Sequence, residues 1–193
     1  METMTIFQHV TFDARRMEGK SVIDLGCGRN KLPGSVGVDF LDLPGVDCVA
    51  DLNERLPFED ASFDVVHSNQ VFEHVPNLLG LIAECHRLLR PGGLLVAHVP
   101  YFRSSWAAVD PTHIRQFSIN SMNYFVRGQY ENEHYRFFEQ SFASLECYLD
   151  GNYPRGPLRW TFTKLALRWP YRFENSVLSF LYPFETLTFV LNK

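Results

Sequence analysis

Three acidic residues and two glycines near the start of the chain have the types and spacing of a small-molecule binding site. Asp24 precedes the Gly26-x-Gly28 pair by two residues, Asp39 ends the next apolar run, and Asp51 ends a third. Glycine lets the backbone turn sharply and approach a ligand without a Cβ clash. Carboxylates accept hydrogen bonds from hydroxyl and amine groups. The pattern therefore predicts a nucleotide-type cofactor site.

The elements that must position these residues are short apolar strands separated by loops or helices. Apolar runs predict five strands, at Ser21–Leu25, Val36–Phe40, Cys48–Asp51, Phe63–His67 and Leu94–Val99. Apolar positions at helical spacing predict a helix over Leu78–Leu89, which Pro91-Gly92-Gly93 ends. Strands that alternate with helices are typical of βαβ units, so we expect an α/β fold with a doubly wound, mostly parallel sheet.

The second half of the chain is less regular. Ser118 is placed to cap a helix that begins near Ile119. Phe142–Leu149 and Glu185–Leu191 are the last two predicted strands. With 193 residues, 46% of them hydrophobic, the chain is expected to form one domain over 1–193, with a basic, aromatic insertion at about 150–183.

A dinucleotide-binding fold is the obvious competitor for the glycine turn. Its G-x-G-x-x-G pattern needs a third glycine at position 31, where this chain has Lys31. A strand-end acid such as Asp24 is also unfavourable beside a pyrophosphate, because like charges repel, whereas an ammonium group would be a partner for it. The residues favour a cofactor that carries a methionine moiety.

Seven stretches of the chain carry a family resemblance. They are Asp24–Gly28, Asp39, Val49–Leu52, Leu56–Phe58, Ser62–Val66, Val71–Val75 and Leu88–Gly93. In these segments the chain resembles the class I S-adenosylmethionine-dependent methyltransferases, and among them the small type 11 family. The resemblance implies a Rossmann-like sheet of seven strands, mostly parallel with the last strand antiparallel. It also implies S-adenosylmethionine as the cofactor, with S-adenosylhomocysteine as the product.

The same resemblance implies a set of cofactor-binding residues. In such proteins the acid at Asp39 binds both ribose hydroxyls. The acid at Asp51 accepts a hydrogen bond from the adenine amino group while Leu52 packs on the ring. Asn69 lies just beyond the fourth strand, at the rim where ligands bind, so we expect it near the methyl-bearing end of the cofactor, or else as a cap or turn residue of the strand. The full predicted set is Asp24, Gly26, Cys27, Gly28, Asp39, Phe40, Asp51, Leu52 and Asn69.

Candidate catalytic residues are His113, Asp110 and His74. The polar run from Asp110 to Phe117 follows the fifth strand, where the resembling family binds its acceptor. His113 is interpreted as a general base whose tautomer Asp110 sets, and the alternative is a hydrogen-bonded loop before the helix at Ser118. His74 is a second candidate base, or else it orders the turn after the fourth strand together with Glu73.

Composition narrows the partners. A net charge of −4 and the absence of an Asn/Asp-Pro-Pro-Tyr/Phe run argue against a nucleic-acid substrate, so a small-molecule acceptor is expected. The four cysteines form no C-x-x-C pair, so no metal site is predicted. With no apolar leader or spanning run, we expect a cytoplasmic protein.

Two questions stay open at this level. The basic aromatic segment 155–182 is interpreted as a helical cap or dimer contact, as an interfacial helix on anionic lipid, or as a wall of an acceptor pocket. The activity expected is methyl transfer to an oxygen or nitrogen of a small molecule, with a glycan or a lipid-linked precursor as examples. The alternative is a non-catalytic module that binds S-adenosylmethionine or S-adenosylhomocysteine for regulation or assembly.

Overall fold

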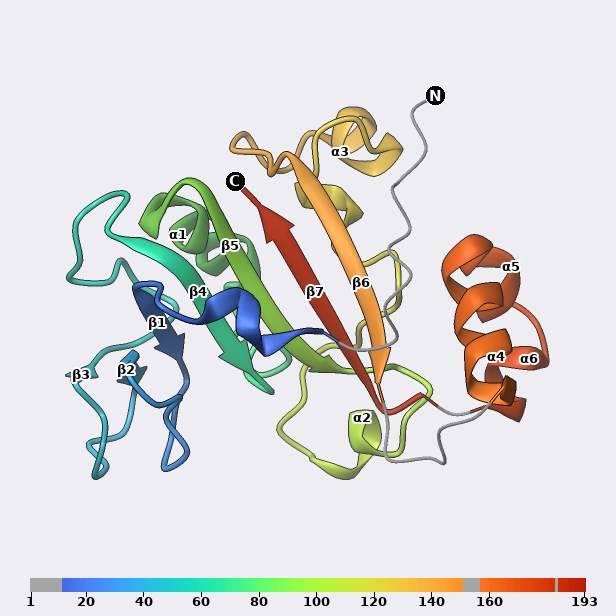
Figure 1. The fold of residues 1–193 in the computed structure, drawn as a ribbon, viewed down its shortest axis with the longest axis horizontal. Coiled ribbons are helices and arrows are strands. Elements are labelled where there is room, and N and C mark those ends of the chain that lie inside the picture. The colour runs from blue at the N-terminus through green and yellow to red at the C-terminus, as the bar shows by residue number, and fades with distance from the viewer. Residues whose placement is uncertain (1–11, 151–156, 183) are drawn as a thin grey trace.

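The computed structural model describes residues 12–150, 157–182 and 184–193. Seven strands form one sheet in the order β3-β2-β1-β4-β5-β7-β6 (Figure 1). They are β1 (Val22–Leu25), β2 (Val36–Asp39), β3 (Cys48–Val49), β4 (Phe63–Asn69), β5 (Leu89–Pro100), β6 (Ser144–Asp150) and β7 (Thr186–Asn192). The helical elements are η1 (Ala14–Met17), α1 (Leu78–Leu88), α2 (Trp106–Val109), η2 (Asn123–Phe125), α3 (Tyr130–Tyr135), α4 (Pro157–Arg168), α5 (Pro170–Glu174) and α6 (Leu178–Leu181).

The strand directions confirm the predicted fold class. All pairs from β3 to β5 are parallel, whereas β7 runs antiparallel to both of its neighbours, β5 and β6. All four residues of β1 are buried, as expected for a central parallel strand that is covered on both faces. The carboxyl ends of β1, β2 and β4 consequently lie at one edge of the sheet.

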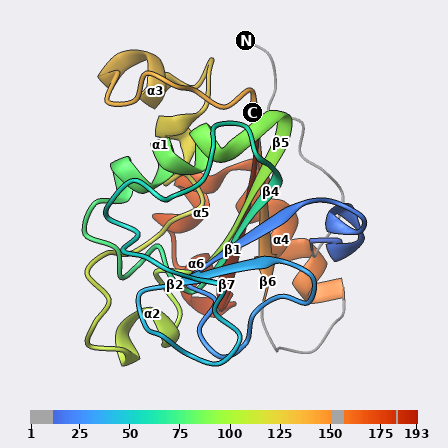
Figure 2. The ribbon, with the colours of Figure 1, turned by 90° about the vertical axis from the view of Figure 1, so that its left-hand side faces the viewer.

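The two faces of the sheet carry different cover. On one face, buried residues of α1 such as Leu81, Ile82 and Leu88 join the main core. On the other face a smaller cluster, including Val65 and Val96, is packed against Phe12, Met17 and Leu32. Figure 2 shows α1 and η1 on opposite sides of the strands.

The predicted helix near Ile119 is wrong. Residues 118–122 form turns instead, followed by the short 3₁₀ helix η2. The Ser121 hydroxyl accepts a hydrogen bond from the Ser118 backbone N–H at 2.8 Å, and the Ile119 N–H donates to the Glu174 carboxylate at 2.9 Å. Local side-chain hydrogen bonds of this kind compete with a helical backbone.

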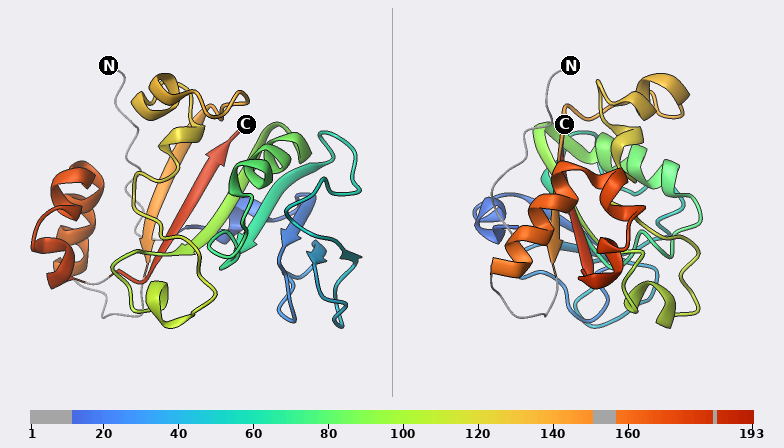
Figure 3. Two further views of the ribbon diagram at one scale, coloured as in Figure 1. Left: turned by 180° about the vertical axis from the view of Figure 1, so that it is seen from behind. Right: turned by 90° about the vertical axis from the view of Figure 1, so that its right-hand side faces the viewer.

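The predicted insertion forms helices α4, α5 and α6, which lie beyond the β6 edge of the sheet (Figure 3). Ala166, Leu167 and Phe173 are buried in the main core. Its exposed large apolar side chains are Leu158, Trp160, Trp169, Tyr171, Val177, Phe180 and Leu181. Arg155, part of the basic pattern seen in the sequence, lies outside the described residues. None of the described helices combines the length and the apolar character needed to cross a membrane.

Candidate functional site

The glycine turn joins β1 to the loop that follows it. Gly26 and Gly28 have φ angles of +67° and +51°, and the N–H groups of Gly26 and Cys27 both donate to the Val38 carbonyl of β2. A Cβ on Gly26 would lie 2.3 Å from a methyl of Val71, whereas a Cβ on Gly28 would meet nothing within 4 Å. Gly26 is therefore required by packing, whereas the need for glycine at position 28 comes from its positive φ rather than from close contacts.

Asp39 holds the turn from the end of β2. Its carboxylate accepts hydrogen bonds from the Gly28 N–H at 2.9 Å and from the Leu41 N–H at 3.0 Å. The side chain is buried, while the neighbouring Phe40 is 72% exposed. A carboxylate fixed in this way at the edge of the glycine turn can accept further hydrogen bonds from ligand hydroxyls, because two oxygens offer about four acceptor sites.

Asp51 follows β3 and is hydrogen-bonded within its own turn. Its Oδ1 accepts from the Asn53 N–H at 2.9 Å and from the Asn53 side-chain amide at 2.8 Å. These hydrogen bonds lower the pKa of Asp51. The next residue, Leu52, is buried in the main core. The predicted roles of both residues toward an adenine ring stay predictions.

Asp24 is engaged by protein groups on both carboxylate oxygens. Oδ1 lies 2.7 Å from Nδ1 of His67, and Oδ2 accepts from the Leu32 N–H at 2.8 Å. Asp24 thus ties the loop after β1 to β4, and its predicted contact with a ligand ammonium stays a prediction. His67 is not among the site residues predicted from the sequence. It is identified by the parallel register of β1 and β4, which places His67 opposite Asp24.

The end of β4 leads to the acceptor side. Asn69 is the last residue of the strand and is exposed, and Gln70 follows in the left-handed region with φ of +56°. The Gln70 N–H donates to the His98 carbonyl of β5 at 2.8 Å. The chain then turns through residues 71–76. Along the chain, Asn69 therefore comes after the glycine turn and just before this second turn.

Glu73, His74 and His113 form a cluster on this side, which we call the acceptor-side cluster. Glu73 is fully buried, with its Oε1 3.9 Å from Nε2 of His113. The rings of His74 and His113 meet edge to face, with their centroids 4.7 Å apart. Burial raises the pKa of Glu73 to about 7. The structure thus brings two predicted catalytic histidines together and adds a carboxyl group that the sequence suggested only as part of a turn.

Arg115 fixes the loop that carries His113. Its guanidinium donates to three backbone carbonyls of the 71–76 turn, those of Phe72, Val75 and Pro76. The Ile114 N–H donates to the Glu73 carbonyl at 3.0 Å. These contacts join segments about forty positions apart in sequence, so the cluster exists only in the folded chain.

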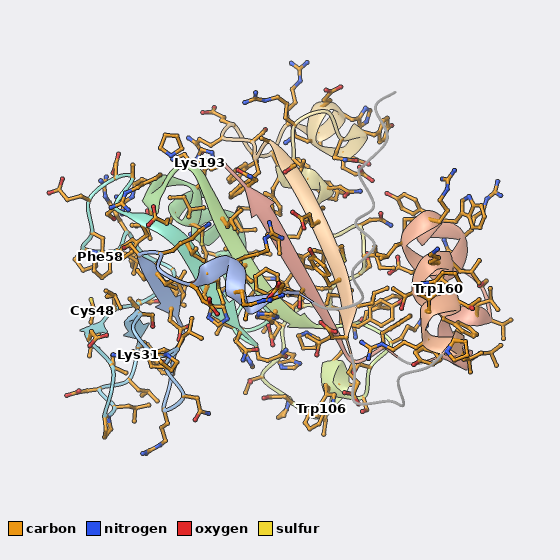
Figure 4. All side chains as sticks on the ribbon, viewed as in Figure 1. Lys31, Cys48, Phe58, Trp106, Trp160 and Lys193 are labelled. Carbon is orange, nitrogen blue, oxygen red and sulfur yellow. The ribbon has the colours of Figure 1, made fainter. Side chains whose placement is uncertain are left out.

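The hydrogen bonds of Asp110 differ from those predicted. Asp110 accepts from the N–H and the hydroxyl of Thr112, at 2.8 and 2.6 Å, and the Thr112 oxygen lies 3.0 Å from Nδ1 of His74. His113 instead has Nδ1 3.3 Å from the Ala107 carbonyl. A carbonyl only accepts, so it sets the His113 tautomer. Asp110 is therefore linked to His74 rather than to His113, because the Thr112 hydroxyl donates to Asp110 and its oxygen contacts His74 Nδ1. Figure 4 shows Trp106 of α2 at the outer end of this loop.

Comparison with known proteins agrees with this geometry. The family described as Methyltransferase domain matches residues 30–97. A phthiotriol/phenolphthiotriol dimycocerosates methyltransferase 1 of Mycobacterium ulcerans is 32% identical, covering 65% of this chain and 56% of that protein. A ubiquinone biosynthesis O-methyltransferase of Photobacterium profundum is 28% identical, covering 44% of this chain and 46% of that protein. The chain spans about half the length of the curated relatives it matches.

A solved structure shows the same fold. The crystal structure of a SAM-dependent methyltransferase from Archaeoglobus fulgidus superposes with a TM-score of 0.60 at 18% identity, covering 90% of this chain and 86% of that one. The family match over residues 30–97 and the relatives support the resemblance of the motifs to the class I S-adenosylmethionine-dependent methyltransferases, and the solved structure shows the same fold. This resemblance implies S-adenosylmethionine as the cofactor, and two observations at the glycine turn are compatible with it: a Cβ on Gly28 would meet nothing within 4 Å, and the Asp39 carboxylate is held beside the Gly28 N–H.

Proposed function

We propose that this protein transfers a methyl group from S-adenosylmethionine to an oxygen or nitrogen of a small-molecule acceptor. The observation that carries the proposal is that Glu73 and His74 of the acceptor-side cluster lie in the turn directly after β4, where Val71 packs against Gly26 of the glycine turn. Ligand and acceptor would thus meet at the same sheet edge. One relative is named a phthiotriol/phenolphthiotriol dimycocerosates methyltransferase and another a ubiquinone biosynthesis O-methyltransferase, and the second name supports an oxygen acceptor.

The residues of this chain would have two roles, which are binding of the cofactor and removal of a proton from the acceptor. Asp39 would hold the ribose, Asp51 and Leu52 the adenine, and the glycine turn the amino-acid part of the cofactor. The bound cofactor supplies an activated methyl group, so the protein mainly orients the acceptor and excludes water. A hydroxyl acceptor must also lose a proton, and His113, with Glu73 and His74 around it, is the group placed to take part in that transfer.

Cofactor binding is tested first, because it does not require the acceptor. Calorimetric titration with S-adenosylhomocysteine is expected to show micromolar affinity, with no binding of NAD. Asp39→Asn should weaken the affinity about 30-fold or more, since hydrogen bonds to a charged group contribute about 1.5–3 kcal/mol each. Asp42→Asn is the matched control, because Asp42 is an exposed acid three positions away. Absence of binding by the unmodified protein would contradict the proposal.

The catalytic part is tested with a panel of hydroxyl and amine acceptors and radiolabelled methyl donor. Once an acceptor is found, His113→Ala should lower kcat/KM by about 100-fold, the usual contribution of general acid–base groups. The exposed His134 of α3 provides the control variant His134→Ala. Equal kcat/KM in the two variants would exclude His113 from proton transfer. Tight cofactor binding without any turnover would favour the non-catalytic module.

A further inference from the structure

The acceptor-side cluster also has the composition of a metal site. Glu73, His74 and His113 each offer one ligand atom, and these atoms all lie within 4.8 Å of one another. We propose that the three side chains bind a divalent first-row transition-metal cation of the zinc class. The cysteine spacing of the sequence predicts no such site, because the ligands here are two imidazoles and a carboxylate from distant segments.

The first argument is the Glu73 carboxyl group. Within the part of the chain that the structure describes, neither of its oxygens has a hydrogen-bond partner, although the residue is fully buried. A buried carboxylate without a partner is strongly unfavourable, so such groups are normally paired or bound to a cation. His113 Nε2, at 3.9 Å, is too far for a hydrogen bond. A cation between these groups would supply the missing partner.

The second argument is the tautomer of each imidazole. The Thr112 hydroxyl donates to Asp110, so its oxygen accepts from Nδ1–H of His74. The Ala107 carbonyl accepts from Nδ1–H of His113. Both rings therefore carry their free lone pair on Nε2. Metal-binding histidines characteristically donate their other N–H to a carboxylate, carbonyl or water, and both rings show this outer arrangement here.

The third argument is the spacing. Ligand atoms of a tetrahedral zinc site lie about 3.4 Å apart when each bond is about 2.1 Å long. The 3.9 Å from Glu73 to His113 is within a small side-chain rotation of that value. Imidazole favours zinc, cobalt, nickel, copper and iron, whereas magnesium prefers oxygen ligands and water. Three protein ligands leave at least one coordination position open, as in catalytic zinc sites.

An open position has a consequence if the proposed methyl transfer is correct. A cation there would bind the acceptor hydroxyl and lower its pKa, as zinc does for bound water. His113 would then serve as a ligand through its Nε2 lone pair, and the cation-bound hydroxyl would lose its proton to solvent water rather than to the imidazole. Metal binding itself does not depend on the methyl-transfer proposal.

Binding is tested on untagged protein treated with a chelator and then dialysed. Zn²⁺ is titrated by calorimetry, and Co²⁺ by the visible absorption that a nitrogen- and oxygen-liganded site produces. We expect one cation per chain with a dissociation constant in the micromolar range or below, and no binding of Mg²⁺. Glu73→Gln and His113→Ala should each weaken Zn²⁺ affinity at least 30-fold, and Thr112→Val about 10-fold through the loss of its contact with His74.

His134→Ala controls for non-specific histidine binding. The S-adenosylhomocysteine titration, run on the same samples, reports separately that each variant is folded and that the cofactor site is intact. A failure of metal binding with normal cofactor binding would overturn this inference and leave the proposed function standing. Zn²⁺ affinity that is equal in His113→Ala and His134→Ala would overturn it as well.

Discussion

The two sides of the candidate site are built by different kinds of contact. On the cofactor side, Gly26, Gly28 and Asp39 lie within fourteen positions of one another and are joined through backbone N–H groups. On the acceptor side, Arg115 reaches the carbonyl of Phe72, 43 positions away, through its side chain. The first side is a local structure on two adjacent strands, whereas the second forms only when β5 and the following loop are in place.

This difference has a mechanical meaning. Backbone hydrogen bonds within a short segment persist through many side-chain changes, because each residue supplies the same N–H and carbonyl groups. The acceptor side depends on individual side chains, above all Arg115 and Thr112. We therefore expect cofactor binding to tolerate substitutions on the acceptor side. We expect the acceptor-side cluster to tolerate substitutions on the cofactor side less well.

The largest expected effect comes from Gly26→Ala. The added methyl would meet Val71 at 2.3 Å and the residue would keep a positive φ, so we expect a loss of about 4 kcal/mol in unfolding free energy. Urea denaturation measures it. Gly34→Ala is the matched control, with φ of +80° but nothing within 4 Å, and should lose only about 1 kcal/mol.

A second substitution separates the two causes within Gly26→Ala. Val71→Ala in the same chain removes the clash but not the strain, so the double variant should recover stability relative to Gly26→Ala alone. Equal stability of the Gly26→Ala and Gly34→Ala chains would show that Val71 moves aside at no cost in free energy. That result would contradict the conclusion that the two sides are closely packed at this point.

The second effect is the response of stability to acid at His98 of β5, the strand that leads into the loop of the acceptor side. His98 of β5 lies with Nδ1 2.8 Å from the Thr188 hydroxyl, and burial, with a smaller effect of His67, lowers its pKa to about 4. Unfolded histidine titrates near 6.5, so the unfolded chain binds more protons between the two values. The free energy of unfolding is therefore unaffected by the titration of His98 above pH 6.5. It decreases as the pH falls from 6.5 to 4, by at most about 3 kcal/mol.

The check is the unfolding free energy at pH 7, 5.5 and 4 for the unmodified chain and for His98→Gln. Glutamine can keep a hydrogen bond to Thr188 but does not titrate. We expect the variant to lose less stability between pH 6.5 and 4. His86→Gln is a useful control, because burial lowers the pKa of His86 as well, at a position outside the site. Parallel pH curves for the unmodified chain and His98→Gln would contradict the assignment.

The smallest effect on stability, about 1–2 kcal/mol, is expected from Arg115→Met. The variant keeps the aliphatic stem but loses the hydrogen bonds to the 71–76 turn. S-adenosylhomocysteine affinity should stay within threefold of the unmodified value, while Zn²⁺ affinity falls about 10-fold, because the His113 loop is no longer fixed. Arg127→Met, on an arginine elsewhere in the chain, is the control. Loss of cofactor affinity in Arg115→Met would remove the distinction between the two sides.

From the sequence alone we predict the family resemblance, the fold class, which the structure confirms, and the outline of the cofactor side. Short apolar runs that end in Asp24, Asp39 and Asp51, with glycines between them, are local signals, and the carboxyl ends of parallel strands share one edge. The direction of β7 followed from the family resemblance. The residues of this side can be predicted because each lies within a few positions of a strand end.

The pairing of the polar residues depends on the tertiary structure and could not be predicted from the sequence. His67 meets Asp24 because β1 and β4 are neighbours, and Glu73 meets His113 because Arg115 holds two segments together. Asp110 was assigned to His113 from sequence proximity, yet its hydrogen bonds lead through Thr112 to His74. Residues about forty positions apart carry no local signal of contact, since side-chain direction and strand order are set by the packing of the whole sheet.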